Sequence, residues 1–227
     1  MTTSEKAYEV VIDFIKKQIS SGTLRLEDRL PPERELAEEL GVSRNSVREA
    51  LRVLDILGVV SSRQGAGNYV SSHFESSLVE MLSLMYLLQN IGYRDLTDFR
   101  YGLERQALTH AVGRATETQV REMEENIRAM EAAGEESLKA AYDKNIHYAI
   151  AKISGNVLIN DTLQALSEVM DRYIVDVRGK ILRRPGNQAR LQDAHRRMVS
   201  AIRDGDLDSG LHALDDHFRC IYESLEE

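Results

Sequence analysis

The second half of this sequence carries an aspartate and three histidines whose spacing could hold a divalent cation. Asp143 and His147 are four residues apart, so on a helix both side chains leave the same face, one turn apart. His195 lies ten residues before Gly205 and His217 twelve after it, so antiparallel helices on either side of that turn would bring both to a similar height. Three imidazoles and one carboxylate suit zinc first, with nickel, manganese or iron as alternatives, and leave positions free for a ligand.

Spacing alone does not bring the first pair beside the second, because residues 157–184 lie between them. A histidine on a helix is also commonly a surface residue, or a core residue with its hydrogen bonds satisfied. We expect this for His73, His110 and His212.

The first half carries residues that could bind nucleic acid. Ser43 predicts the N-cap of a helix in which Arg44, Arg48 and Arg52 share one face, opposite a face of apolar residues. Charges at this spacing are also typical of a solvated helix face. Arginine can pair with guanine or phosphate, asparagine with adenine, and serine with phosphate. The candidate contacts at the start of this helix are Ser43, Arg44, Asn45, Ser46 and Arg48.

The elements that would position this helix are short. Residues 5–20 and 33–40 predict two amphipathic helices before it, and Gly58 ends it. Residues 59–70 predict a strand, a glycine-rich tip and a second strand, which is a β-hairpin wing. Arg63 and Gln64 are the expected wing contacts, and the glycines at 65 and 67 let backbone approach the minor groove.

Composition fits two soluble domains better than a membrane protein or an exported one. The net charge is −8, but residues 1–70 carry 10 basic and 11 acidic side chains, whereas residues 71–227 carry 19 and 26. A local basic surface within the first half is enough for DNA binding, whatever the net charge of the whole chain. No apolar run approaches the ~20 residues that span a bilayer. The absence of a signal peptide, with Cys220 as the single cysteine, predicts a cytoplasmic protein.

We therefore predict a mainly α fold in two domains. Residues 1–72 would form a winged helix-turn-helix of three helices plus the hairpin, and residues 73–77, part of a serine-rich stretch, would be the linker. Residues 78–227 would form an antiparallel all-α bundle of six or seven helices, interrupted at glycine-containing breaks.

Two stretches of the first half, LPPERELAEELGVSRNSVREALRVLDILGVV and RQGAGNYV, resemble the DNA-binding domain of the GntR family of regulators over residues 6–70. The resemblance implies that Arg34, Arg44 and Arg48 touch DNA, with Gly65 at the wing tip. Two departures are visible. Leu26-Glu27 replaces a frequent Pro-Gly, and Asn68 stands where threonine is usual.

The segments DFRYGLERQAL, DKNIHYAIAKISGN, DAHRRMVSAIRDGD and ALDDHF resemble the ligand-binding (FCD-type) domain of the FadR subfamily, over about residues 78–224. That resemblance implies a metal site of Asp143, His147, His195 and His217. It also matches Arg100 to a pocket arginine that could clamp a carboxylate effector. The alternative role for Arg100 is an ion pair with Glu104, four residues on.

Together these features predict a homodimeric transcription regulator, commonly a repressor in such families. It would bind a palindromic operator in double-stranded DNA, and a small organic acid at the metal would change operator affinity. Two alternatives stay open: a metal-dependent enzyme acting on a small carboxylate, and a regulator whose metal is purely structural. No membrane partner is expected.

Overall fold

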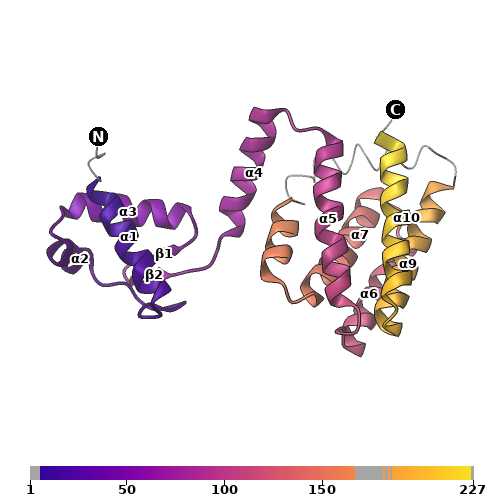
Figure 1. Ribbon diagram of the computed structural model, residues 1–227, viewed down its shortest axis with the longest axis horizontal. Helices are drawn as coiled ribbons and strands as arrows, with labels where there is room; N and C mark the ends of the chain where they lie inside the picture. The colour runs from indigo at the N-terminus through magenta and orange to yellow at the C-terminus, as the bar shows by residue number, and fades with distance from the viewer. Residues whose placement is uncertain (1–5, 167–180, 182–183, 185, 226–227) are drawn as a thin grey trace. The chain divides into compact units, whose positions relative to one another are not determined.

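The computed structural model describes residues 6–166, 181, 184 and 186–225. The chain divides into two compact units between Leu78 and Val79. Helices dominate both units, and the strands that the structure describes form a single two-stranded hairpin (Figure 1). The predicted mainly α fold is confirmed. In the described part of the chain, no helix combines the length and apolar character that crossing a bilayer requires.

The N-terminal unit is a winged helix-turn-helix. Its elements are α1 (Ala7–Ser20), α2 (Glu33–Leu40), α3 (Arg44–Ile56), β1 (Val60–Arg63) and β2 (Gly67–Val70). The helices form where apolar residues recur at helical spacing, and those residues meet in one core. Ile15 of α1, Leu36 of α2 and Leu54 of α3 are fully buried there. Ser43 caps α3 as predicted, its hydroxyl accepting the backbone N–H of Ser46 at 3.1 Å.

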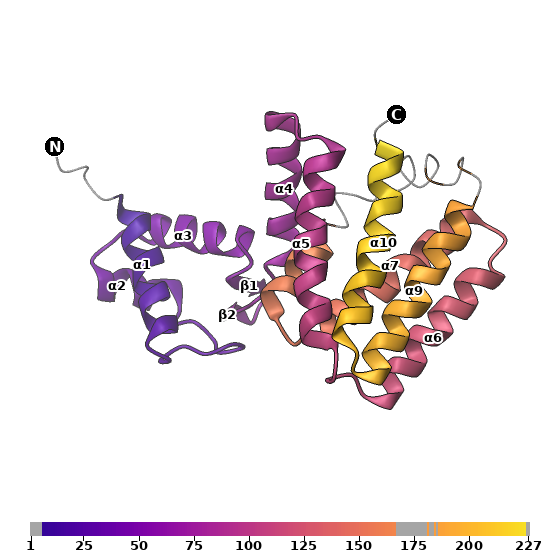
Figure 2. The same ribbon diagram turned by 45° about the vertical axis from the view of Figure 1, so that its right-hand side comes forward.

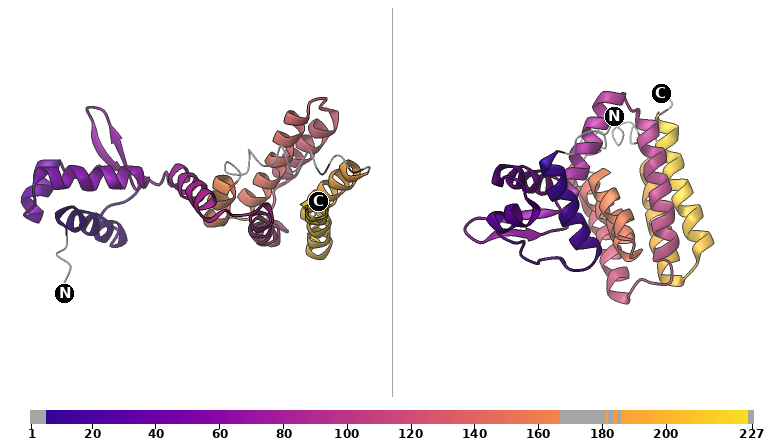
Figure 3. Two further views of the ribbon diagram at one scale, coloured as in Figure 1. Left: turned by 90° about the horizontal axis from the view of Figure 1, so that it is seen from above. Right: turned by 60° about the vertical axis from the view of Figure 1, so that its left-hand side comes forward.

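The wing follows α3 through a turn that only glycine fits. Gly58 has φ +75°, and a Cβ there would lie 2.1 Å from the backbone oxygen of His73. The two strands pair antiparallel, with Val60 opposite Val70. Figure 3 (left) shows the hairpin projecting from the helices of its own unit.

Helix α4 (Glu75–Gln89) begins inside residues 73–77, where the sequence suggested a linker. The backbone N–H of Leu78 already donates to the carbonyl of Phe74 at 2.9 Å. Glu75 supplies an acidic side chain in the first turn, where the helix dipole favours it. The hydroxyl of Ser77 also hydrogen-bonds to the carbonyl of Ile56 at the end of α3. These contacts favour helix in a stretch whose serines suggested a loop.

In the C-terminal unit, helices are the regular elements that the structure describes. Its further helices are α5 (Tyr93–Ala111), α6 (Glu117–Ala132), α7 (Glu136–Ile153), α9 (Asn187–Asp204) and α10 (Leu207–Leu225), and residues 157–166 are also helical. Five of them close a ring: α5 packs on α7, α7 on α6, α6 on α9, α9 on α10, and α10 on α5. Figure 2 shows these helices side by side. The ring encloses an apolar core that includes Leu108, Met123, Ile146, Met198 and Phe218.

Candidate metal centre and nucleic-acid interface

Three helices of the ring send polar side chains to one place in its interior. Asp143 and His147 come from α7, His195 from α9 and His217 from α10, and all three histidines are buried. Each lies next to core residues of its own helix, as His147 does beside Ile146. The helical periodicity that buries the apolar residues therefore also turns these polar side chains inward. The structure brings together all four residues that the sequence singled out.

The atoms that could bind a cation converge. Nε2 of His147 lies 3.2 Å from Nε2 of His195. The carboxylate of Asp143 reaches the same atoms, with Oδ1 3.1 Å from Nε2 of His195 and Oδ2 4.0 Å from Nε2 of His147. Ligand nitrogens of the three histidines all lie within 4.8 Å of one another. Such a set can surround one ion.

His217 gives the sharpest indication that a cation fits here. Both of its ring nitrogens are buried and have no hydrogen-bond partner in the described structure. Burial lowers the pKa of His217 well below its usual range, and nearby His195 and His147 lower it further. The ring is therefore neutral at physiological pH, and its free lone pair would cost stability unless something binds it. Neutral imidazole is also the form that binds metals.

The carboxylate of Asp143 is ionised despite its burial. Burial raises the pKa of Asp143, but His195 and the other histidines outweigh it and hold the pKa well below its usual range. One carboxylate and three imidazoles suit a divalent ion of the zinc type. The residues present therefore fit the metal that the sequence predicted.

Glu104 of α5 is a fifth residue of the centre, although its spacing in the sequence predicted only an ion pair with Arg100. It is 3% exposed, and its Oε2 lies 2.6 Å from Nδ1 of His147, close enough for an ion pair but without the alignment of a hydrogen bond. On its other side, Nε of Arg100 donates to Oε1 of Glu104. Burial raises the pKa of Glu104, but Arg100 and His147 outweigh it and lower the pKa to about 2.

This contact orients His147. A carboxylate at Nδ1 fixes which ring nitrogen carries the proton and so leaves Nε2 free for a metal. The sequence did contain a signal, because Glu104 precedes the buried Ala107 and Leu108 by three and four residues and therefore shares their face. Arg100 adopts the ion pair that was one of its two predicted roles.

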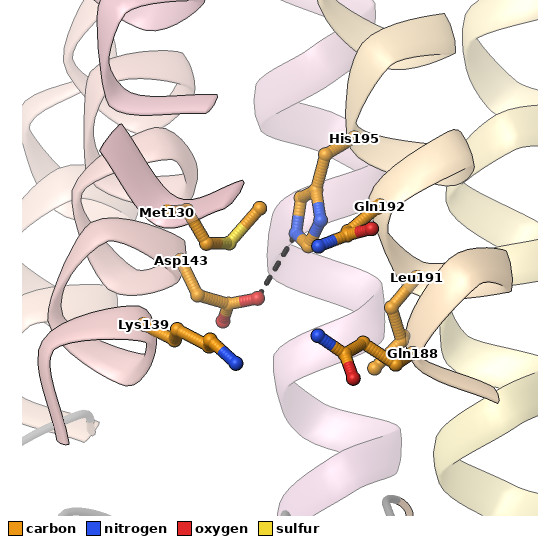
Figure 4. A pocket seen from close by; sticks show the side chains of 7 residues that line it. All are labelled: Met130, Lys139, Asp143, Gln188, Leu191, Gln192 and His195. Atoms are coloured by element: carbon orange, nitrogen blue, oxygen red, sulfur yellow. Dashed lines mark ion pairs between the residues drawn. The ribbon is translucent and has the colours of Figure 1, made fainter. Parts of the chain in front are cut away.

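A narrow pocket opens beside the centre, between α6, α7 and α9 (Figure 4). Its lining residues are Met130, Lys139, Asp143, Gln188, Leu191, Gln192 and His195. Its free space holds about one water molecule. Asp143 and His195 are the metal-site residues that it reaches. The pocket therefore reaches the centre on the side formed by Asp143 and His195.

The predicted DNA-reading residues lie on one exposed end of α3. Arg44, Asn45 and Arg48 are exposed around its N-terminus. Their charges are partly compensated within the unit, because Oε2 of Glu33 lies 2.7 Å from Nε of Arg48 and 4.0 Å from Nη2 of Arg44. Arg34 is likewise exposed, with its Nε 3.6 Å from Oε1 of Glu38. This end of the unit therefore carries a cluster of exposed arginines.

The wing adds exposed residues at Arg63, Gln64 and Gly65. Gly65 has φ +74° and open space where a Cβ would be. Arg63 pairs with Glu27, and its guanidinium lies over the ring of Tyr69, 4.3 Å from the ring centre. Glu27 stands where the family often has glycine, and it adopts the left-handed φ of +68° that glycine would favour.

Comparison with known families gives two matches that together cover most of the chain. Residues 7–70 match the model described as bacterial regulatory proteins, gntR family. Residues 95–219, more than half of the chain, match the FCD domain. The first match includes the predicted DNA-binding residues, and the second includes the whole candidate metal centre.

Full-length relatives are also found. The chain is 29% identical to the Glc operon transcriptional activator of Escherichia coli strain K12, covering 96% of this chain and 89% of the relative. It is 29% identical to the HTH-type transcriptional regulator LutR of Bacillus subtilis, covering 82% and 86%. Among solved structures, Streptococcus agalactiae GntR superposes with a TM-score of 0.67 at 26% identity, covering 96% of this chain and 99% of that one.

Proposed function

Because this chain belongs to the GntR family of bacterial regulatory proteins and carries an FCD domain, we propose that it is a ligand-controlled transcription regulator acting as a homodimer on a palindromic operator. Its family and relatives are transcription regulators and not enzymes, which sets the metalloenzyme alternative aside. As a bacterial DNA-binding regulator, it would act in the cytoplasm. In the proposal, the N-terminal unit reads DNA and the metal centre senses a small organic acid.

The DNA-reading part is supported by the exposed cluster at the start of α3. Arg44 and Arg48 would enter the major groove and Arg34 would contact its rim, while Ser43, Asn45 and Ser46 supply hydrogen bonds. Arg63, Gln64, Gly65 and Gly67 of the wing would approach the minor groove. Fluorescence anisotropy on an operator selected from random DNA tests this assignment. Arg44→Ala and Arg48→Ala should each weaken specific binding by about 1–3 kcal/mol, whereas unchanged affinity in both variants would contradict it.

The sensing part rests on the buried quartet, and one observation carries it: both ring nitrogens of His217 are buried without a partner. In the proposal, Asp143, His147, His195 and His217 hold a divalent cation, zinc first among the candidates, with Glu104 orienting His147. When bound, the metal supplies a Lewis-acidic centre for the oxygens of an organic acid. A role for Arg100 in binding the effector stays a prediction; in the structure its guanidinium pairs with Glu104.

Elemental analysis with operator binding tests this part. The purified protein should contain about one transition-metal ion per chain, and a panel of small acids should change operator affinity only for the metal-loaded form. Metal binding that stabilises the bundle with no response to any acid would support the purely structural alternative. The proposed dimer fits the exposed apolar side chains of α4, such as Leu84, Leu87 and Leu88. Sedimentation analysis measures it directly.

A further inference from the structure

An extended segment before α2 widens the sheet of the wing. Residues 27–30 run alongside β2, and the backbone N–H of Leu30 donates to the carbonyl of Asn68 at 2.8 Å. Arg29 stands opposite Tyr69 in an antiparallel bridge. The segment is therefore held in register with the wing, although it comes some thirty residues earlier in the chain.

The pairing sorts the side chains of this small sheet onto two faces. Residues opposite each other on antiparallel strands share a face, and successive residues of one strand alternate between faces. Leu30, Val60 and Val70 point into the core and are at most 4% exposed. Arg29 precedes Leu30 and is exposed, so its side chain lies on the outer face, as does that of Tyr69.

The guanidinium of Arg29 lies against the far end of the wing. A Cβ at Gly67 would lie 3.1 Å from Nε and 3.3 Å from Nη2 of Arg29. Gly67 is the first residue of β2 and follows the exposed Gly65 of the tip by two residues. Glycine at this position therefore leaves the space that the guanidinium occupies, and a positive charge is placed next to the tip.

Arg29 differs from Arg63, the arginine of β1, in its partners. Arg63 pairs with Glu27, and its guanidinium lies over the ring of Tyr69. Among the residues that the structure describes, no carboxylate forms an ion pair with Arg29. An exposed guanidinium of this kind can pair with an anion without first breaking an ion pair. The charge of Arg29 is therefore the one that the outer face of the wing leaves uncompensated.

We propose that Arg29 binds a phosphate of the DNA backbone at the border of the groove that the wing enters. Its guanidinium would donate hydrogen bonds to the phosphate oxygens, which fixes the position of the wing and reads no base. A phosphate fits better than a base edge because Arg29 lies along the side of the hairpin, whereas Gln64 and Gly65 form its tip. This inference rests on the proposed DNA-reading role of the N-terminal unit.

Anisotropy titrations of the whole chain at several salt concentrations test this contact, with the selected operator and a scrambled duplex of equal length. Arg29→Gln should weaken binding to both duplexes by the same factor, about fivefold to tenfold for each bound chain near 0.1 M salt. The slope of log affinity against log salt should become shallower by about one for each bound chain. Arg29→Lys should keep the wild-type slope, because the slope counts charges.

Arg121→Gln is the matched control. Arg121 is an exposed arginine on α6, in the other unit, so the variant makes the same change in net charge away from the reading head. It should leave both affinities and both salt slopes as in wild type, since charges beyond about 10 Å are screened at this salt concentration. Thermal melts of Arg29→Gln should match wild type, because the exposed guanidinium has no ion pair to lose.

The outcomes separate this contact from the proposed function. If Arg29→Gln binds both duplexes with wild-type affinity and salt slope, the phosphate contact is wrong while DNA reading stands. If only operator binding weakens, Arg29 reads bases and the phosphate contact is again wrong. A lower melting temperature that accompanies weaker binding would make the role structural and overturn the proposal. If the wild-type chain binds neither duplex, the proposed function itself is wrong, and this contact with it.

Discussion

Replacing Glu104 by glutamine removes one charge from the centre while keeping the side chain's size. The pKa of Glu104 is lowered from 4.5 to about 2 by Arg100 and His147 in spite of burial. Such a lowering corresponds to about 3 kcal/mol of stability at neutral pH. Glu104→Gln should therefore lower the free energy of unfolding of the metal-free protein by about that amount, because Arg100 loses its buried partner.

The pH dependence has a definite sign. A carboxyl whose pKa is lowered on folding contributes its full stability above the unfolded value, near 4.5 for Glu104, and loses it as pH falls toward about 2. The stability gap between wild type and Glu104→Gln should be constant from neutral pH to about pH 5 and should narrow below about 4.5. Urea unfolding in the presence of a chelator, repeated across this range, measures the gap.

Zinc affinity gives an independent measurement on the same variant. Loss of the carboxylate that orients a metal-binding histidine typically lowers metal affinity by about tenfold to a hundredfold. Competition with a chromophoric chelator would detect this. Glu131→Gln is the matched control, because Glu131 forms a more exposed ion pair with Arg196, and it should cost less than about 1 kcal/mol. If Glu104→Gln matches this control in stability and wild type in zinc affinity, the positioning role of Glu104 is refuted.

Three further variants test other parts of the structure. Glu33→Gln should strengthen binding to random DNA and steepen its salt dependence in anisotropy titrations, because the carboxylate no longer competes with phosphate for Arg48; an unchanged salt slope would count against this. Gly58→Ala should lower the melting temperature far more than Gly22→Ala, since both have positive φ but only at Gly58 would a Cβ collide with backbone; equal losses would be inconsistent with that geometry. His217→Leu should abolish stabilisation by zinc yet leave the metal-free protein at least as stable in thermal melts, because it removes two unpaired buried nitrogens; a destabilised metal-free protein would contradict this.

The winged helix-turn-helix could be predicted nearly residue by residue because its signals are local. Ser43 caps α3 and Gly58 ends it through rules that involve only neighbouring residues. The start of α4 was predicted less accurately, because serines in its first turn suggested a loop. The hydrogen bond from Ser77 to Ile56, which favours the helix, joins residues 21 apart in sequence. The ion pair of Glu27 with Arg63 was also not predicted, because the two residues are 36 apart in sequence.

The metal centre could be predicted only in part. The spacing of Asp143 and His147 placed them on one face, but their approach to His195 depends on α6 packing between α7 and α9 in the ring. The resemblance to the FadR subfamily implied that these residues form one site, and the structure then brought them together. The role of Glu104 at the centre was not predicted, because the sequence named it only as a partner of Arg100 and tertiary packing brings its carboxylate against His147.

The closed ring of α5, α7, α6, α9 and α10 makes a cation at its middle a structural element in its own right. The predicted ligands come from three helices and Glu104 supports them from a fourth, so α5, α7, α9 and α10 must all be in place together. Any ion held there is therefore bound by the assembled bundle and not by the unfolded chain, so affinity for the ion adds directly to the bundle's resistance to unfolding. A cell's supply of that ion would then set how long each copy of the regulator survives as well as what it senses.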